Sequence, residues 1–131
     1  MYEYELKNGA AHLNTQFGEL IVSADPEKGF KPIELLISSL VGCSGGILET
    51  VLKKKRIDYD SIRVQTNIER NKEKANRVER VDFHYIIEGK NLKEEQVQKS
   101  LDLTLKYCGM IQTVIGSVEV HETFELINHP S

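Results

Sequence analysis

Cysteine is scarce in this chain of 131 residues, which contains only Cys43 and Cys108. Two cysteines are too few to form a zinc site by themselves, and no histidine lies at ligand spacing from either of them. We therefore expect no bound metal ion and no other cofactor. In a cytoplasmic protein, two cysteines are more typical of free thiols, a redox pair or core residues than of a structural disulfide.

An export signal and long apolar runs are also missing. The first residues, MYEYELKNG, are charged and alternating, and they lack the apolar segment of a signal peptide. No stretch reaches the roughly 18 apolar residues that a membrane span needs. We therefore expect a cytoplasmic protein that does not associate with a membrane.

Positive charge is not in excess, because 17 lysine and arginine residues stand against 20 aspartate and glutamate residues and give a net charge of −3. This balance argues against a nucleic-acid partner. The basic cluster at residues 53–56 falls at the end of a predicted helix, where cations interact favourably with the last carbonyl groups. The phosphate-loop signature and the Gly-x-Ser-x-Gly signature of hydrolases are both absent.

What the chain does contain is a clear succession of strand and helix patterns. Apolar residues that alternate with polar ones predict strands, and apolar residues spaced by three and four predict helices. The expected strands cover residues 2–7, 10–15, 19–23, 62–68, 81–87 and 118–126. The expected helices cover residues 31–56 and 91–108, with a short apolar piece at 110–115 and a frayed tail at 127–131. The order βββ-α-ββ-α-β indicates an α+β protein with a single domain over residues 1–131.

Two short signals refine this pattern. Asn8-Gly9 predicts a tight hairpin turn, because both residues accept a positive φ. Asn91 and Glu94 have the spacing of a capping box at the start of the second helix.

The chain is organised around the helix expected at residues 31–56. Its apolar stripe is wide, so we expect a buried central helix that is contacted on more than one side. Gly42, Gly45 and Gly46 each cost about 1 kcal/mol relative to alanine inside a helix. Glycines are retained at such a cost where another helix or a ligand approaches the backbone closely.

Cys43 lies at the midpoint of this helix, on or beside the apolar stripe. A lone cysteine in such a place is most often a core residue. Cys108, however, lies just before Gly109 and the short apolar piece, and if that piece is helical its amide groups would stabilise a thiolate. From the residues alone, a redox pair and two core residues both stay open. The four histidines are scattered and are expected on the surface or on strand faces: His12, His84, His121 and His129.

The two cysteine segments resemble the OsmC/Ohr family, the osmotically inducible and organic-hydroperoxide-resistance proteins. The matching segments are residues 29–36, 38–43, 106–109 and 116–120. The chain is most similar to the YhfA-like branch of the family. This resemblance implies an α+β fold with a buried central helix, and an intertwined homodimer with active sites at the subunit interface.

The resemblance also implies a thiol chemistry in defence against oxidative stress. Cys43 would be the peroxidatic cysteine, which attacks an organic hydroperoxide and becomes a sulfenic acid. Cys108 would be the resolving cysteine, which forms a disulfide with Cys43. A dithiol reductant, such as a lipoylated protein or a small thiol, would then reduce this disulfide.

The sequence departs from the family's peroxidases at two points. Ile33 occupies the position of their activating glutamate, and Glu34 falls on roughly the opposite face of the helix from Cys43. Their thiolate-binding arginine has no match, because no arginine precedes Arg56 and only His12 lies in the corresponding region. Two alternatives to a hydroperoxide reductase therefore remain. One is a non-catalytic dimer that binds a small apolar or acyl ligand at its interface, and the other is a structural dimer in which both cysteines belong to the core.

Overall fold

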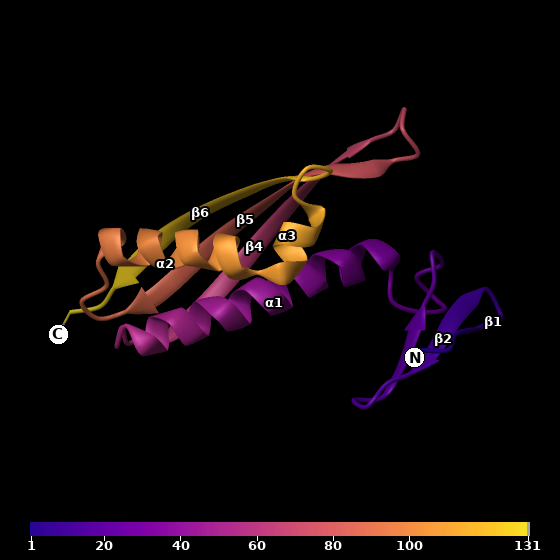
Figure 1. Cartoon of the computed structure of the whole chain (residues 1–131), viewed down its shortest axis with the longest axis horizontal. Coiled ribbons are helices and arrows are strands. Elements are labelled where there is room, and N and C mark those ends of the chain that lie inside the picture. The colour runs from indigo at the N-terminus through magenta and orange to yellow at the C-terminus, as the bar shows by residue number, and fades with distance from the viewer. Residues whose placement is uncertain (131) are drawn as a thin grey trace. The chain divides into compact units, whose positions relative to one another are not determined.

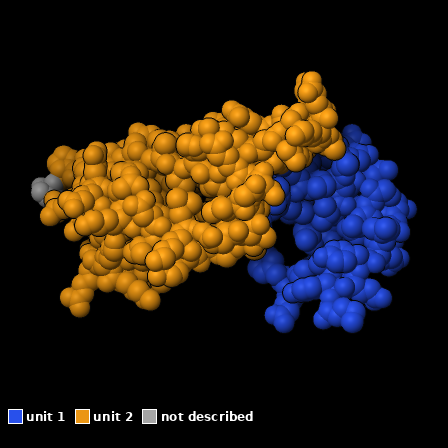
Figure 2. Space-filling model, turned by 45° about the horizontal axis from the view of Figure 1, so that its top comes forward, with its two compact units in different colours: residues 1–40 blue, residues 41–131 orange. Residues whose placement is uncertain are grey.

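The computed structural model describes residues 1–130 and divides the chain into two compact units (Figure 2). The first unit comprises Met1–Leu40, and the second begins at Val41. The boundary falls inside one continuous helix, α1, which runs from Pro32 to Lys54. The single domain expected over residues 1–131 stays a prediction.

The first unit contains a small antiparallel sheet in the order β1-β2-β3. Its strands are β1 (Glu5–Lys7), β2 (Ala10–Asn14) and β3 (Glu19–Val22). Asn8 and Gly9 form the turn between the first two strands with φ angles of 53° and 76°, which confirms the predicted hairpin turn. β1 is shorter than expected, since it begins at Glu5 instead of residue 2.

The loop that leads into α1 is held against β3. The amide of Phe30 donates to the carbonyl of Ile21 at 2.8 Å, and the amide of Ser23 donates to the carbonyl of Phe30 at 3.0 Å. A Cβ atom at Gly29 would lie 2.7 Å from the carbonyl oxygen of Ile21, so only glycine fits this approach. The helix then begins at Pro32, where a missing amide hydrogen costs nothing.

The second unit contains a sheet in the order β4-β5-β6 (Figure 1). Its strands are β4 (Ser61–Asn71), β5 (Arg77–Gly89) and β6 (Glu119–Asn128). β5 pairs antiparallel with β4 and parallel with β6. The three strands lie where the alternation predicts them but are longer. The prediction of a frayed tail was wrong for residues 127 and 128, because β6 continues through both.

Two helices connect β5 to β6: α2 (Glu94–Tyr107) and α3 (Gly109–Val114). The predicted capping box at Asn91 was wrong, since Asn91 has a φ of 58° and Lys93 stands at the N-cap. The backbone before α2 is instead fixed by Asn128 of β6, whose side chain accepts from the amide of Leu92 at 2.8 Å and donates to its carbonyl at 3.1 Å. The short apolar piece is helical.

The core of the second unit lies between one face of its sheet and the helices. The inward side chains of β5 are at most 1% exposed: Val81, Phe83, Tyr85 and Ile87. Leu48 and Leu52 of α1 and Val97 of α2 are fully buried in the same core. The apolar face of the sheet and the apolar faces of α1 and α2 therefore form one core, as their amphipathic patterns require.

In the single chain α1 is buried along one face only, which differs from the expected burial on several sides. Ser44, Leu48 and Leu52 are at most 1% exposed, whereas Gly42, Gly46 and Thr50 on the other face are exposed. Apart from the adjoining residues and the backbone of the helix itself, no described atom lies within 4 Å of a Cβ atom built on Gly42, Gly45 or Gly46. By length and composition α1 could also cross a membrane, so the expectation that no stretch is apolar enough was wrong.

Candidate active site

Both cysteines belong to the second unit and stand on different helices. Cys43 lies on α1 and is partly exposed. Cys108 is fully buried at the junction of two helices, where it ends α2 and also caps the start of α3. Its amide donates to the carbonyl of Thr104 at 2.9 Å, and its carbonyl accepts from the amide of Gln112 at 2.9 Å. The position of Cys108 is therefore fixed by backbone hydrogen bonds on both sides.

The structure brings the two thiols together. The thiol of Cys43 lies within hydrogen-bonding reach of the thiol of Cys108 and of the backbone amides of Gly109 and Met110 at the start of α3. Both cysteines are free. The sequence left open whether the two cysteines lie near each other, and the fold answers this because the end of α2 packs beside the middle of α1.

The surroundings separate the pKa values of the two thiols. The amide of Met110 and then the thiol of Cys108 lower the pKa of Cys43, against a smaller opposing effect of burial. Burial raises the pKa of Cys108, although the amide of Ile111 donates to its sulfur at 3.5 Å. The site thus contains an accessible thiol that ionises readily beside an enclosed thiol that does not.

This arrangement corrects one expectation about the short helix α3. We expected its amide groups to stabilise a thiolate at Cys108. The Ile111 amide does contact that sulfur, but burial outweighs it, and the amides of Gly109 and Met110 lower the pKa of Cys43 instead. The reason is geometric, because Cys43 reaches these amides from the neighbouring helix.

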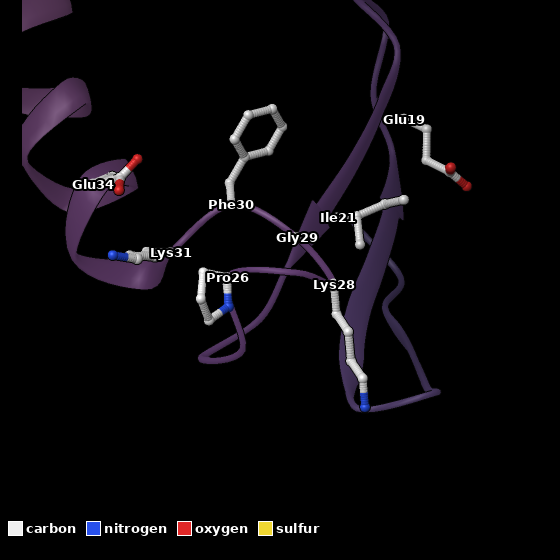
Figure 3. Close-up of a pocket in the computed structure, with 8 residues that line it drawn as sticks. All are labelled: Glu19, Ile21, Pro26, Lys28, Gly29, Phe30, Lys31 and Glu34. Carbon is white, nitrogen blue, oxygen red and sulfur yellow. The ribbon is translucent and has the colours of Figure 1, made fainter.

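The groups that act on Cys43 are amides and a thiol, and no charged side chain of residues 1–130 is among them. Glu34 is exposed in the first unit, where it lines an open hollow of about 470 Å³ together with Phe30 and Lys31 (Figure 3). His12 lies in β2 of the same unit, and its Nε2 atom is enclosed without a partner in the described part of the chain. Backbone amides and the Cys108 thiol therefore lower the pKa of Cys43 without a charged partner.

The remaining histidines form hydrogen bonds on exposed parts of the second unit, as expected. His84 bonds Thr123 through Nδ1 at 2.7 Å and Glu125 through Nε2 at 3.0 Å. His121 bonds Glu119 at 2.9 Å. Among residues 1–130, no three histidine, cysteine, aspartate or glutamate side chains come together as metal ligands.

A polar network that the sequence reasoning missed lies inside the same core. The hydroxyl of Tyr85 donates to Oε2 of Glu122 at 2.6 Å and lies 3.4 Å from the hydroxyl of Ser44. Burial raises the pKa of Glu122, and burial followed by the Glu122 charge raises the pKa of Tyr85. The signal was present in the sequence, because Glu122 occupies an inward position where the strand alternation calls for an apolar residue.

The fold and the paired thiols can now be compared with known proteins. The model of the OsmC-like protein family matches residues 25–123. The chain belongs to the OsmC-like family. The resemblance noted in the sequence is confirmed, and α1 is the long central helix of an α+β fold.

Individual relatives agree with this family. The OsmC-like chain is 26% identical over 102 residues to the protein YhfA of Escherichia coli, covering 77% of this chain and 76% of YhfA. It is 25% identical over 118 residues to the organic hydroperoxide resistance protein OhrB of Bacillus subtilis, covering 85% of this chain and 86% of OhrB. The crystal structure of a hypothetical protein from Aquifex aeolicus superposes with a TM-score of 0.88 at 26% identity, covering 99% of this chain and 97% of that one.

Proposed function

We propose that this OsmC-like protein is a thiol-dependent reductase of organic hydroperoxides, with Cys43 as the peroxidatic and Cys108 as the resolving cysteine. The observation that carries the proposal is the contact between two thiols with opposite pKa shifts. Nucleophilic attack needs an accessible thiolate, which the lowered pKa of Cys43 favours. Resolution needs a second thiol close to the first, and Cys108 is such a thiol.

The reaction would proceed in two steps. The Cys43 thiolate attacks the terminal oxygen of a hydroperoxide, the O–O bond breaks, the leaving alkoxide takes one proton from solvent to become the alcohol, and Cys43 becomes a sulfenic acid. The Cys108 thiol then attacks the sulfur of Cys43, water leaves, and a disulfide forms. An external dithiol, such as a lipoylated protein or a small thiol, returns both cysteines to thiols. The printed name of the B. subtilis relative, which refers to organic hydroperoxide resistance, supports this substrate class.

The assembly that we propose is a cytoplasmic homodimer that works in oxidative stress defence. Its support is the exposure of α1, on which Cys43 and Ile47 are only half-buried while Gly42 and Gly46 leave the backbone open to a close neighbour. A second copy of the chain would cover this part of α1 and bury the helix on the sides that the single chain leaves open. No nucleic acid, membrane or cofactor takes part in this proposal.

The test of the chemistry is a peptide map after treatment with stoichiometric cumene hydroperoxide. We expect a disulfide between Cys43 and Cys108 in the wild-type protein. Cys108→Ser should instead accumulate a sulfenic acid at Cys43 that dimedone traps, and Cys43→Ser should consume no hydroperoxide. Two free thiols in the treated wild-type protein would overturn the proposal. Thiols that react with a reagent only after denaturation would indicate core residues instead.

A second candidate is a binding protein without turnover, and two observations favour it. Ile33 replaces the activating glutamate of the family's peroxidases. The hollow in the first unit also combines apolar walls from Ile21 and Phe30 with the charges of Lys31 and Glu34, which suits a small acyl ligand with a polar end (Figure 3). Native mass spectrometry should then show a co-purified ligand that Cys43→Ser retains, with no hydroperoxide consumption by the wild-type protein.

A further inference from the structure

A hollow of about 530 Å³ lies in the second unit, and neither cysteine lines it. Its walls come from α2, from the end of α3 with the turn after it, and from the start of β6. Four apolar side chains in these walls are left partly uncovered by the chain: Leu105, Ile115, Val118 and Val120. Hollows of about 300–1,000 Å³ with apolar walls suit small molecules, and a ligand that covers these side chains gains free energy by removing them from water.

The walls of this hollow are held in place by hydrogen bonds of the chain itself. Nε2 of Gln112 on α3 donates to the carbonyl of Leu105 on α2 at 2.9 Å, which ties the two helices together. The amide of Val118 donates to the carbonyl of Val114 at 2.8 Å and fixes the turn after α3. Val120 lies in the part of β6 that pairs with β5. The hollow is therefore formed without a ligand, so binding needs little ordering of the protein.

Two opposite charges at the edge of the hollow do not pair with each other. Asp102 and Lys106 stand one turn apart on α2, and both are exposed. Opposite charges at this spacing commonly pair, as Glu95 and Lys99 do at 3.3 Å on the same helix. Asp102 instead accepts from the side-chain amide of Gln98 at 3.0 Å, and Nζ of Lys106 lies 5.4 Å from the centroid of the tyrosine ring at the next position. Within residues 1–130 neither charge forms an ion pair.

The third charged residue in the walls is already engaged. Oε1 of Glu119 lies 3.6 Å from Nη1 of Arg80 and 2.9 Å from Nε2 of His121. The charges that remain open to a ligand are thus one carboxylate, Asp102, and one ammonium, Lys106. A ligand with a single charge would match one of them and meet a like charge at the other.

We propose that this hollow binds an apolar α-amino acid, such as leucine, in its zwitterionic form. The ammonium of the ligand pairs with Asp102, and its carboxylate pairs with Lys106. Its apolar side chain covers Ile115 and Val118. The proposal is independent of the thiol chemistry, because it uses neither cysteine.

The first test is a nuclear magnetic resonance titration of the ¹⁵N-labelled full-length protein with L-leucine. We expect shifts in the amides that surround the hollow, those of Leu105, Gln112, Gly116 and Val118, and none in the sheet of the first unit. Glycine, which has both charges but no apolar side chain, should bind more weakly than leucine. Unmoved amides around the hollow, or equal affinities for glycine and leucine, would overturn the proposal.

The second test separates the two charges. 4-Methylpentanoate lacks the ammonium of leucine and 3-methylbutylamine lacks its carboxylate, so the wild-type protein should bind leucine more tightly than either. Asp102→Asn should abolish the preference over 4-methylpentanoate, and Lys106→Gln should abolish the preference over 3-methylbutylamine. Each variant should weaken leucine binding about two- to fivefold, as expected for exposed ion pairs.

The matched controls are Glu95→Gln and Lys99→Gln, which remove charges at the same spacing on the same helix but outside the hollow. Both should bind leucine as the wild-type protein does. All four substitutions are at exposed positions, so the variants should fold. Leucine affinities that are equal in the wild-type protein, Asp102→Asn and Lys106→Gln contradict the proposed site.

Discussion

Backbone amides lower the pKa of Cys43, and this has a measurable consequence. A thiolate beside an arginine is screened by salt, whereas fixed amides at contact distance are screened far less. We predict that the rate of Cys43 alkylation rises with pH below the ordinary thiol value of 9.0 and keeps this profile in high salt. Cys108→Ala should move the profile to higher pH, because it removes a thiol that donates to Cys43. Alkylation rates followed by mass spectrometry across pH provide the measurement, and a profile that moves with salt would show that a charged side chain is at work.

Glu122 should also make the stability of the protein depend on pH. Burial raises its pKa above the ordinary value of 4.5, so the unfolded chain ionises this group first as the pH rises. The stability that a neutral Glu122 permits is therefore complete below about pH 4.5 and is lost as the pH rises through its folded pKa. We predict that the free energy of unfolding of the wild-type protein falls across this window relative to that of Glu122→Gln. Urea unfolding at several pH values measures this difference, and a constant difference would mean that folding does not change the pKa of Glu122.

The sequence identified the two thiols, but it could not identify what surrounds them. Cys43 and Cys108 were found because both lie in motifs that resemble those of a known family. The amides of Gly109 and Met110 carry no side-chain signal, so their contact with Cys43 depends on the tertiary packing of two helices. Glu122 did leave a signal, a charged residue in an apolar alternation, but its meaning depends on Tyr85 facing it from the neighbouring strand.

At the scale of elements, the loop before α1 depends on one close contact. A Cβ atom at Gly29 would meet the Ile21 carbonyl oxygen at 2.7 Å, and a backbone atom cannot move aside as a flexible side chain would. We predict that Gly29→Ala destabilises the protein by about 1–3 kcal/mol, as overpacking usually does. Glu27→Ala, exposed in the same loop, should leave the stability nearly unchanged. Chemical unfolding of both variants is the measurement, and equal stabilities would mean that the loop relaxes freely.

The helices and strands that could be predicted from the sequence are those that depend on interactions between residues close together in the chain. Alternation and the Asn8-Gly9 turn are local, so the strands and the first hairpin could be predicted. The start of α2 could not, because Asn128 fixes the preceding backbone from the far end of β6. The strand ends were also underestimated, since pairing with β5 extends β6 beyond its regular alternation.

At the scale of the whole molecule, the open face of α1 leads to a prediction about assembly. Replacing Gly46 by alanine should gain about 1 kcal/mol in an isolated helix, because alanine favours helix. If a second copy packs closely against this face, the added methyl group should instead weaken the dimer. We predict a larger dimer dissociation constant for Gly46→Ala, measured by analytical ultracentrifugation. A variant that is more stable and equally dimeric would place the dimer contact elsewhere.

The parallel pairing of β5 with β6 also determines when the molecule can be completed during synthesis. β5 is the middle strand of its sheet, but its second neighbour is the last strand of the chain and follows two intervening helices. Such non-local pairing forms late, so the growing polypeptide leaves the ribosome with α1 made and its core face uncovered. Cys43 therefore exists for a time without Cys108. A newly made chain that meets an oxidant in this interval has no internal partner with which to form a disulfide, and its thiol is then most exposed to irreversible oxidation.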